Sequence, residues 1–293
     1  MNYTITNGKL TVTARTFGGE LTSIKDGNGT EYLWQGNPEY WHGQAPVLFP
    51  IVGSLRNKKA VIGGNKTCCM ERHGVARKKE FRMARKDDGS VVFSLSADEE
   101  TKARYPYDFQ LETAYVLDGA GVTVQHTVYN PNPAVLPFQI GGHPAFNCPA
   151  DPAERFEDYE VEFEKPETAD CPLMDENGIP QMDRRVSVIK NSRILPMKHE
   201  LFLKDALIFD RIQSRKVTLR SRKSGKGICV SFPELNYLLI WSSANGGPFV
   251  ALEPWSGLPT CSDEGDVFEQ KRGVFLLPAG EKKVVSYRIS VVG

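Results

Sequence analysis

Residues 115–128 read Tyr-Val-Leu-Asp-Gly-Ala-Gly-Val-Thr-Val-Gln-His-Thr-Val. Apolar side chains alternate with polar ones before and after the turn at Asp118–Gly121, which is the pattern of two antiparallel strands joined as a hairpin. Gly-rich turns of a similar kind occur at residues 26–29 and 87–89. The stretch therefore predicts antiparallel sheet with one buried face.

Short alternating or apolar runs continue along the chain, at about the 8–12 residue spacing of an all-β sandwich or barrel. Helical periodicity is confined to Asp98–Arg104 and His199–Lys204, and the loosest stretches are Pro131–Pro137 and Glu164–Met182. We therefore expect one all-β domain, residues 1–293, with few short helices. The other runs that we interpret as strands are residues 10–15, 91–96, 161–164, 217–219, 228–232, 237–241, 249–252, 274–277 and 284–292.

The composition indicates an ordinary globular protein with an uncharged partner. The chain has 36 Lys and Arg against 36 Asp and Glu, so its formal net charge is zero. This balance disfavours nucleic acid and anionic membranes as partners, because both attract a positive field. No apolar run approaches the ~18 residues of a membrane helix, and no signal peptide is visible. Six cysteines without a Cys-x-x-Cys pair predict reduced thiols in a cytoplasmic protein without structural zinc.

Two of the five histidines lie in unusual sequence settings. His143 follows two glycines, which let the backbone adopt strained dihedrals or approach a ligand closely, and it precedes a proline, which presents the imidazole rigidly. His73 precedes a glycine and is flanked by charged residues. Each could be a structural or a functional histidine. We interpret the other three as solvated residues: His42, His126 and His199.

A carboxylate ends the apolar run at residues 249–252. Glu253 follows this run and precedes Pro254 and Trp255. Because a carboxylate is costly to bury, Glu253 should be exposed, paired or functional. The functional alternative is a general base whose pKa is raised by partial burial beside Trp255.

Four motifs occur in a fixed order along the chain. They are Pro-Val-Leu-Phe-Pro-Ile-Val-Gly at 46–53, His-Gly-Val-Ala-Arg at 73–77, Gly-Gly-His-Pro-Ala-Phe-Asn at 141–147 and Leu-Glu-Pro-Trp at 252–255. In order and spacing the chain resembles the aldose 1-epimerase (galactose mutarotase) family, in particular its LacX-like branch, from about Thr11 to Val291. The resemblance implies a β-supersandwich of large, twisted antiparallel sheets.

The same resemblance implies an isomerase that interconverts the α and β anomers of a free hexose. His143 matches the general acid toward the ring oxygen of the sugar, and Glu253 matches the general base on the anomeric hydroxyl. His73 matches a second histidine that polarises the ring oxygen, and Asp205 matches an aspartate that hydrogen-bonds sugar hydroxyls. No cofactor or metal is implied, because an acid and a base on opposite sides of a pyranose suffice for ring opening and closure.

The remaining substrate contacts are expected from one arginine and two aromatic residues. The family arginine should follow the Pro-Ile-Val-Gly segment directly, but Ser54 stands there, so Arg56 is the nearest candidate. Trp255 and Phe146 are candidates to cover an apolar face of the sugar ring.

Other functions stay open at this point. The two histidines and Glu253 could hold iron or zinc, although no local His-x-Asp or His-x-Glu spacing accompanies them. A non-catalytic carbohydrate-binding sandwich needs no acid–base pair. A hexose-phosphate epimerase needs converging arginines, for which Arg56, Arg72 and Arg77 are available. The expected partner is a small-molecule sugar, and the expected assembly is a monomer or a homodimer.

Overall fold

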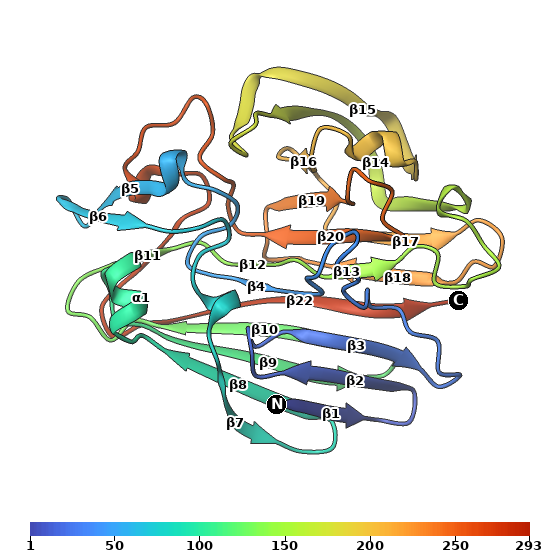
Figure 1. Ribbon diagram of the computed structural model, residues 1–293, viewed down its shortest axis with the longest axis horizontal. Helices are drawn as coiled ribbons and strands as arrows, with labels where there is room; N and C mark the ends of the chain where they lie inside the picture. Colours follow the sequence, from blue (N-terminus) through green and yellow to red (C-terminus); the bar gives the residue numbers. More distant parts are fainter.

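In the structure, a computed structural model that describes residues 1–293, the regular secondary structure is almost entirely antiparallel strand (Figure 1). This confirms the all-β supersandwich with few short helices. The single α-helix, α1 (Glu99–Arg104), begins where expected, because the Asp98 carboxylate accepts a 2.7 Å hydrogen bond from the Thr101 N–H. The 3₁₀ helices are η1 (Arg56–Lys58), η2 (Ala76–Lys78), η3 (Phe156–Asp158), η4 (His199–Phe202) and η5 (Phe268–Gln270).

The largest sheet has nine strands in the order β15-β14-β17-β18-β22-β10-β9-β8-β7. Its centre contains the hairpin predicted from residues 115–128, in which Tyr115 pairs with Val124. The strands of this sheet are β7 (Arg82–Lys86), β8 (Ser90–Ser96), β9 (Gln110–Asp118), β10 (Gly121–Tyr129), β14 (Tyr159–Met174), β15 (Pro180–Pro196), β17 (Lys216–Ser221), β18 (Gly227–Ser231) and β22 (Lys282–Val292).

A second layer faces the nine-stranded sheet (Figure 1). Its six-stranded sheet contains β4 (Val47–Leu48), β12 (Gly141–Gly142), β13 (Ala145–Asn147), β16 (Leu207–Phe209), β19 (Tyr237–Trp241) and β20 (Phe249–Trp255). A three-stranded sheet contains β1 (Asn2–Thr6), β2 (Leu10–Arg15) and β3 (Leu21–Asp26). Two isolated pairs are β5 (Lys59–Ile62) with β6 (Lys66–Cys69), and β11 (Leu136–Phe138) with β21 (Phe275–Leu277).

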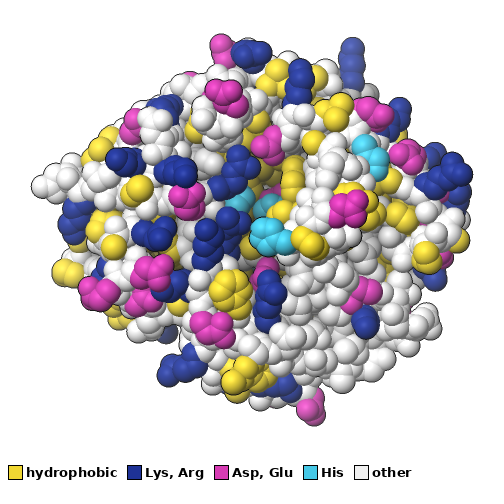
Figure 2. Space-filling view, in the orientation of Figure 1, with side chains coloured by type: hydrophobic (Ala, Val, Ile, Leu, Met, Phe, Trp, Pro, Cys, Tyr) yellow, Lys and Arg dark blue, Asp and Glu magenta, His cyan; other side chains and the backbone are white.

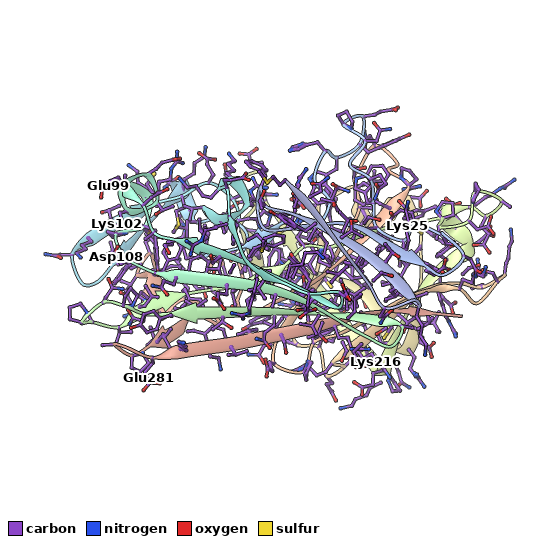
Figure 3. The ribbon with its side chains drawn as sticks, turned by 90° about the horizontal axis from the view of Figure 1, so that it is seen from below. Lys25, Glu99, Lys102, Asp108, Lys216 and Glu281 are labelled. Carbon is purple, nitrogen blue, oxygen red and sulfur yellow. The ribbon has the colours of Figure 1, made fainter.

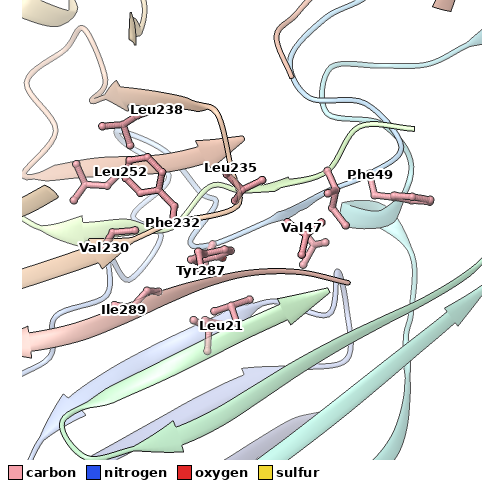
Figure 4. Close-up of a cluster of buried hydrophobic side chains, with 14 of the residues drawn as sticks. Leu21, Val47, Phe49, Val230, Phe232, Leu235, Leu238, Leu252, Tyr287 and Ile289 are labelled. Atoms are coloured by element: carbon pink, nitrogen blue, oxygen red, sulfur yellow. The ribbon is translucent and has the colours of Figure 1, made fainter. Parts of the chain in front are cut away.

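The hydrophobic core fills the space between these layers. One cluster of 63 buried side chains extends from Ile5 to Ile289. In Figure 4, Val230 of β18 and Tyr287 of β22 lie below the side chains of β19 and β20. Figure 3 shows the opposite kind of residue, charged side chains such as Lys102 and Asp108, at the periphery of the molecule. Two further clusters contain seven and four buried side chains.

The long ribbon formed by β14 and β15 differs from the prediction, which had Glu164–Met182 as a loose stretch. These are the two longest strands of the molecule, and they lie at one edge of the nine-stranded sheet. Their register shifts at several points, beginning between Glu162 and Glu167. Each bulge moves the following side chains to the other face, so the apolar alternation that marks a strand is interrupted.

The interpretation of His126 as a solvated residue is also wrong. Its side chain is buried, and its Nδ1 lies 3.0 Å from the Thr113 hydroxyl. The strand period of two places it on the same face as Val124 and Val128, which is the core face. His42 is exposed, as expected, whereas His199 is half-buried against Phe156. None of the helices is long and apolar enough to span a bilayer.

Candidate active site

A cavity of about 270 Å³ opens beside the ends of β19 and β20 and collects most of the residues singled out in the sequence. Figure 2 shows histidine and basic side chains around a hollow near the middle of this face. The side chains that line the cavity include Trp41, Arg72, His73, Arg77, His143, Met174, Asp205, Leu239, Trp241, Glu253 and Trp255.

Glu253 lies within β20, a strand whose seven residues are all buried. It pairs with Leu239 of β19, and only 1% of its surface is exposed. The structural alternative of an exposed strand-end carboxylate is therefore wrong. The Glu253 Oε2 is buried and accepts no well-aligned hydrogen bond; its one close polar neighbour is His143 Nε2.

His143 directly follows the short strand β12. A Cβ on Gly141 would lie 2.7 Å from Trp255 Cδ1, and one on Gly142 would lie 2.2 Å from Tyr287 Oη. The two glycines thus allow close packing against these aromatic side chains, not the approach of a ligand. The Trp255 indole N–H donates to the Gly142 carbonyl at 3.2 Å and ties the two motifs together.

His73 occupies the left-handed backbone region, with φ of 70°. Its backbone N–H donates to the Gly53 carbonyl at 2.8 Å, and its Nδ1 accepts from the Gly53 N–H at 3.1 Å. Because a backbone N–H can only donate, the neutral ring carries its proton on Nε2. The Pro-Ile-Val-Gly segment therefore sets the tautomer of His73.

His143 and Glu253 form a close pair at the cavity, with Nε2 and Oε2 3.2 Å apart. Burial raises the pKa of Glu253 well above its ordinary value; Asp205 raises it further and Arg72 opposes the shift. Burial lowers the pKa of His143 to about 3; its own backbone opposes this shift, and Arg77 and Arg72 reinforce it. Because the carboxyl pKa is shifted up and the imidazole pKa is shifted down, a single proton on the pair resides on Glu253 rather than on His143.

His73 completes a histidine pair beside this carboxyl group. Its ring lies edge-to-face with His143, at 5.4 Å between centroids, and with Trp255, at 5.6 Å. Burial lowers the pKa of His73 well below its ordinary value, and the charges of His143, Arg77 and Arg72 lower it further. His73 is therefore a neutral hydrogen-bond donor at neutral pH.

Asp205 lies at the rim of the cavity on the turn that follows η4, with a left-handed φ of 76°. Its Oδ2 is 3.6 Å from an Arg72 guanidinium nitrogen, and its Oδ1 accepts from the Ala206 N–H at 2.8 Å. The Arg72 Nε donates to the Ser54 hydroxyl at 3.1 Å. This rim offers both acceptors and donors to hydroxyl groups.

Two of the expected substrate-binding residues lie outside the cavity. Arg56 donates from Nη1 to Asp266 Oδ1 at 2.7 Å and from Nη2 to the Cys261 and Glu264 carbonyls, so it holds the loop before η5. Phe146 is 1% exposed and belongs to the core, because β13 turns this side chain away from the cavity. Trp255 and Asp205 do line the cavity, as expected.

The basic residues at the cavity are Arg72 and Arg77, which flank the His73 motif, rather than Arg56. The Arg77 Nε is buried without a hydrogen-bond partner, and burial lowers the pKa of this guanidinium. Sequence reasoning missed Trp41 and Trp241 altogether. Both are far from His73 and His143 in sequence, and no local pattern marks them as cavity residues.

The cluster does not have the geometry of a metal site, because no three His, Cys, Asp or Glu side chains are grouped to hold an ion. The arrangement is instead a buried carboxyl and imidazole in contact, a second imidazole with a defined donor, and a polar rim. Such a set can remove a proton from one oxygen and deliver a proton to a neighbouring one.

Comparison with known proteins gives a consistent result. The family model described as aldose 1-epimerase matches residues 1–271. Two LacX proteins of Lactococcus lactis subsp. lactis, plasmid and chromosomal, are 44% identical over 299 residues and cover 100% of both chains.

Solved structures agree with this assignment. A galactose mutarotase related enzyme from Lactobacillus acidophilus is 29% identical, with a TM-score of 0.94 over 100% of this chain and 98% of that one. A galactose mutarotase-like protein from Lactobacillus casei is also 29% identical, with a TM-score of 0.92 over 100% of both chains. By its sequence, its fold and its relatives, the chain belongs to the aldose 1-epimerase family.

Proposed function

We propose that this protein is a cytoplasmic aldose 1-epimerase that acts, as a single domain, on a free hexose. The observation that supports this most directly is the contact between His143 Nε2 and Glu253 Oε2, 3.2 Å apart at the cavity. Membership of the aldose 1-epimerase family supports the reaction type. The zero net charge agrees with an uncharged substrate, which needs no electrostatic steering.

Ring opening needs one proton removed and one proton supplied. In the reactive form of the pair, Glu253 is a carboxylate and His143 carries the proton. Glu253 takes the proton of the anomeric hydroxyl O1, and His143 gives its proton to the ring oxygen O5. The C1–O5 bond breaks, and C1 becomes an aldehyde carbon. The pair still holds one proton, now on Glu253, which is the form that burial favours.

Ring closure reverses these transfers after rotation about the C1–C2 bond. His143 recovers the proton from the O5 hydroxyl as O5 attacks C1, and Glu253 returns its proton to O1. Attack on the other face of C1 produces the other anomer. O1 and O5 are bonded to the same carbon, so adjacent groups can serve both. This replaces the expectation of an acid and a base on opposite sides of the sugar.

The other cavity residues bind and orient the sugar in this proposal. His73 donates its Nε2–H to the ring oxygen and weakens the C1–O5 bond as negative charge develops. The Trp255 ring covers an apolar face of the pyranose, and Asp205 with Arg72 binds hydroxyl groups.

Polarimetry on freshly dissolved α-glucose and α-galactose tests the proposal. We expect Glu253→Gln and His143→Asn each to lower kcat by roughly 10²–10⁴-fold, the usual contribution of an acid or a base. Arg56→Lys is the matched control, because Arg56 lies outside the cavity, and it should retain wild-type activity. Equal rates for the wild type and both cavity variants would refute the mechanism.

A second candidate, a hexose-phosphate epimerase, is favoured by Arg72 and Arg77 at the cavity. The unpartnered Nε of Arg77 is a donor that a phosphate oxygen would satisfy. A kcat/KM that is higher for glucose 6-phosphate than for glucose, and that loses this preference in Arg77→Gln, would select this candidate. Sugar binding by calorimetry without anomer exchange would indicate a carbohydrate-binding protein instead.

A further inference from the structure

The imidazole of His143 is surrounded by aromatic rings. Trp41 stacks on it, with centroids 4.8 Å apart and planes 25° from parallel. Trp241 and His73 lie near-perpendicular to it, with centroids 5.6 and 5.4 Å away. Trp41 is therefore the one aromatic residue that covers a face of the proposed acid.

The orientation of His143 has no support from a neighbouring hydrogen-bonding side chain. Its Nδ1 is buried and has no partner on another residue, and its Nε2 lies against Glu253. A histidine that moves protons is usually oriented through its second nitrogen by a carboxylate or a carbonyl group. Here aromatic packing is left to hold the ring in position.

The loop that carries Trp41 is built to hold this indole in place. The Trp34 indole N–H donates to the Trp41 carbonyl at 2.8 Å. A Cβ on Gly43 would lie 2.4 Å from Trp41 Cζ2, so only glycine leaves room for the ring where it stands. Trp241 supports it from the side, with centroids 5.3 Å apart and planes 85° from parallel.

From these contacts we infer that Trp41 is a positioning residue, which holds His143 against Glu253 and stabilises the imidazolium that donates to the ring oxygen. The electron-rich face of an indole attracts a cation stacked on it. Among the charged groups that face His143, Glu253 favours its protonated form, whereas Arg72 and Arg77 oppose it. The neutral His73 supplies no counter-charge.

The inference rests on the proposed function, and kinetics distinguish it from simple stacking of Trp41 on the sugar. We expect Trp41→Leu to lower kcat roughly tenfold and Trp41→Phe to lower it less, because phenylalanine keeps a weaker aromatic face. KM should stay unchanged in both. A raised KM at unchanged kcat would overturn the inference and assign Trp41 to substrate binding.

Titration of the His143 ring by NMR on isotope-labelled protein provides a readout that does not depend on activity. Loss of the indole face should lower the pKa of His143 in Trp41→Leu, with Trp41→Phe between that variant and the wild type. If Trp41 only excluded water, the smaller leucine would admit water and the pKa would rise toward the ordinary value. A rise would therefore overturn the inference.

Two further variants provide controls. Gly43→Ala keeps the indole but displaces it, so it should reproduce the effects of Trp41→Leu. Tyr40→Leu makes the same kind of change one residue away, outside the cavity, and should leave kcat and the His143 titration unchanged. An inactive wild type with the expected NMR shifts would refute the proposed function but keep the Trp41–His143 contact. An active wild type, together with a His143 pKa that does not change in the Trp41 variants, would refute the role of Trp41 and leave the proposed function intact.

Discussion

Glu253 and His143 illustrate at the residue scale why an ionisable pair is costly to bury and useful once buried. Burial raises the pKa of the carboxyl and lowers that of the imidazole, because it disfavours the charged form of each group. Sequence motifs identified both residues. The sequence did not identify their contact, because β12 and β20 approach each other only in the folded sheet.

The raised pKa of Glu253 predicts that this buried carboxyl reduces the stability of the wild type. As the pH rises above 4.5, the unfolded carboxyl loses its proton while the folded one retains it, so folding becomes less favourable. Gln does not titrate. Glu253→Gln should therefore be more stable than the wild type at neutral pH, by about 1.4 kcal/mol for each pH unit by which the folded pKa is raised.

Urea unfolding of both proteins at several pH values measures this difference. The gap in unfolding free energy should be smallest below pH 4.5, the ordinary pKa of the carboxyl, and should widen toward neutral pH. A gap that stays constant with pH would contradict a raised pKa for Glu253.

At the element scale, short strands with special sequences position the site. β12 consists of two glycines between β4 and β20, and it brings His143 beside Glu253. The sequence pattern drew attention to these glycines, but it could not predict which side chains pack against them. Trp255 and Tyr287 lie more than 100 residues further along the chain, on β20 and β22.

A methyl group on β12 should therefore disturb both stability and activity. In Gly142→Ala the added Cβ would overlap the Tyr287 hydroxyl at 2.2 Å, so strand or ring must shift. We expect a loss of roughly 1–3 kcal/mol in unfolding free energy, as for other overpacked sites, and a lower kcat. Gly265→Ala is the control, because nothing lies within 4 Å of its Cβ position. Equal melting temperatures for the two variants would contradict this packing argument.

At the scale of the whole molecule, the two-layer core buries polar groups far from the cavity. His126 is 1% exposed between β9 and β22, with its Nε2 unpartnered. Burial alone lowers its pKa to about 4 from the ordinary 6.5. The fold therefore depends on a neutral histidine in its interior.

Acid should destabilise the entire fold through this residue. Between pH 6.5 and about 4 the unfolded chain binds a proton at His126 that the folded chain excludes, so stability falls as the pH falls. The full shift corresponds to about 3 kcal/mol. Chemical unfolding across this range should show the loss in the wild type and a smaller loss in His126→Gln. An equal pH dependence of the unfolding free energy in the wild type and in His126→Gln would contradict the assignment.

Local patterns predicted the elements whose side chains alternate regularly. They include the hairpin at residues 115–128, the capped helix at Asp98 and most strands. These could be predicted from the sequence because the hydrophobic period and helix capping act over a few residues. The β14–β15 ribbon could not be predicted, because bulges interrupt the alternation of its apolar and polar side chains.

The sequence by itself determined the all-β class and, through four motifs, the family and the candidate site residues His73, His143 and Glu253. The family resemblance added Asp205 as a further candidate. Only the tertiary structure excluded Arg56 and Phe146 from the cavity and brought Trp41, Arg72 and Arg77 into it. The physical reason is that a motif specifies a backbone path over a few residues. Which side chains meet across a cavity depends on the packing of strands and loops that are distant in the chain.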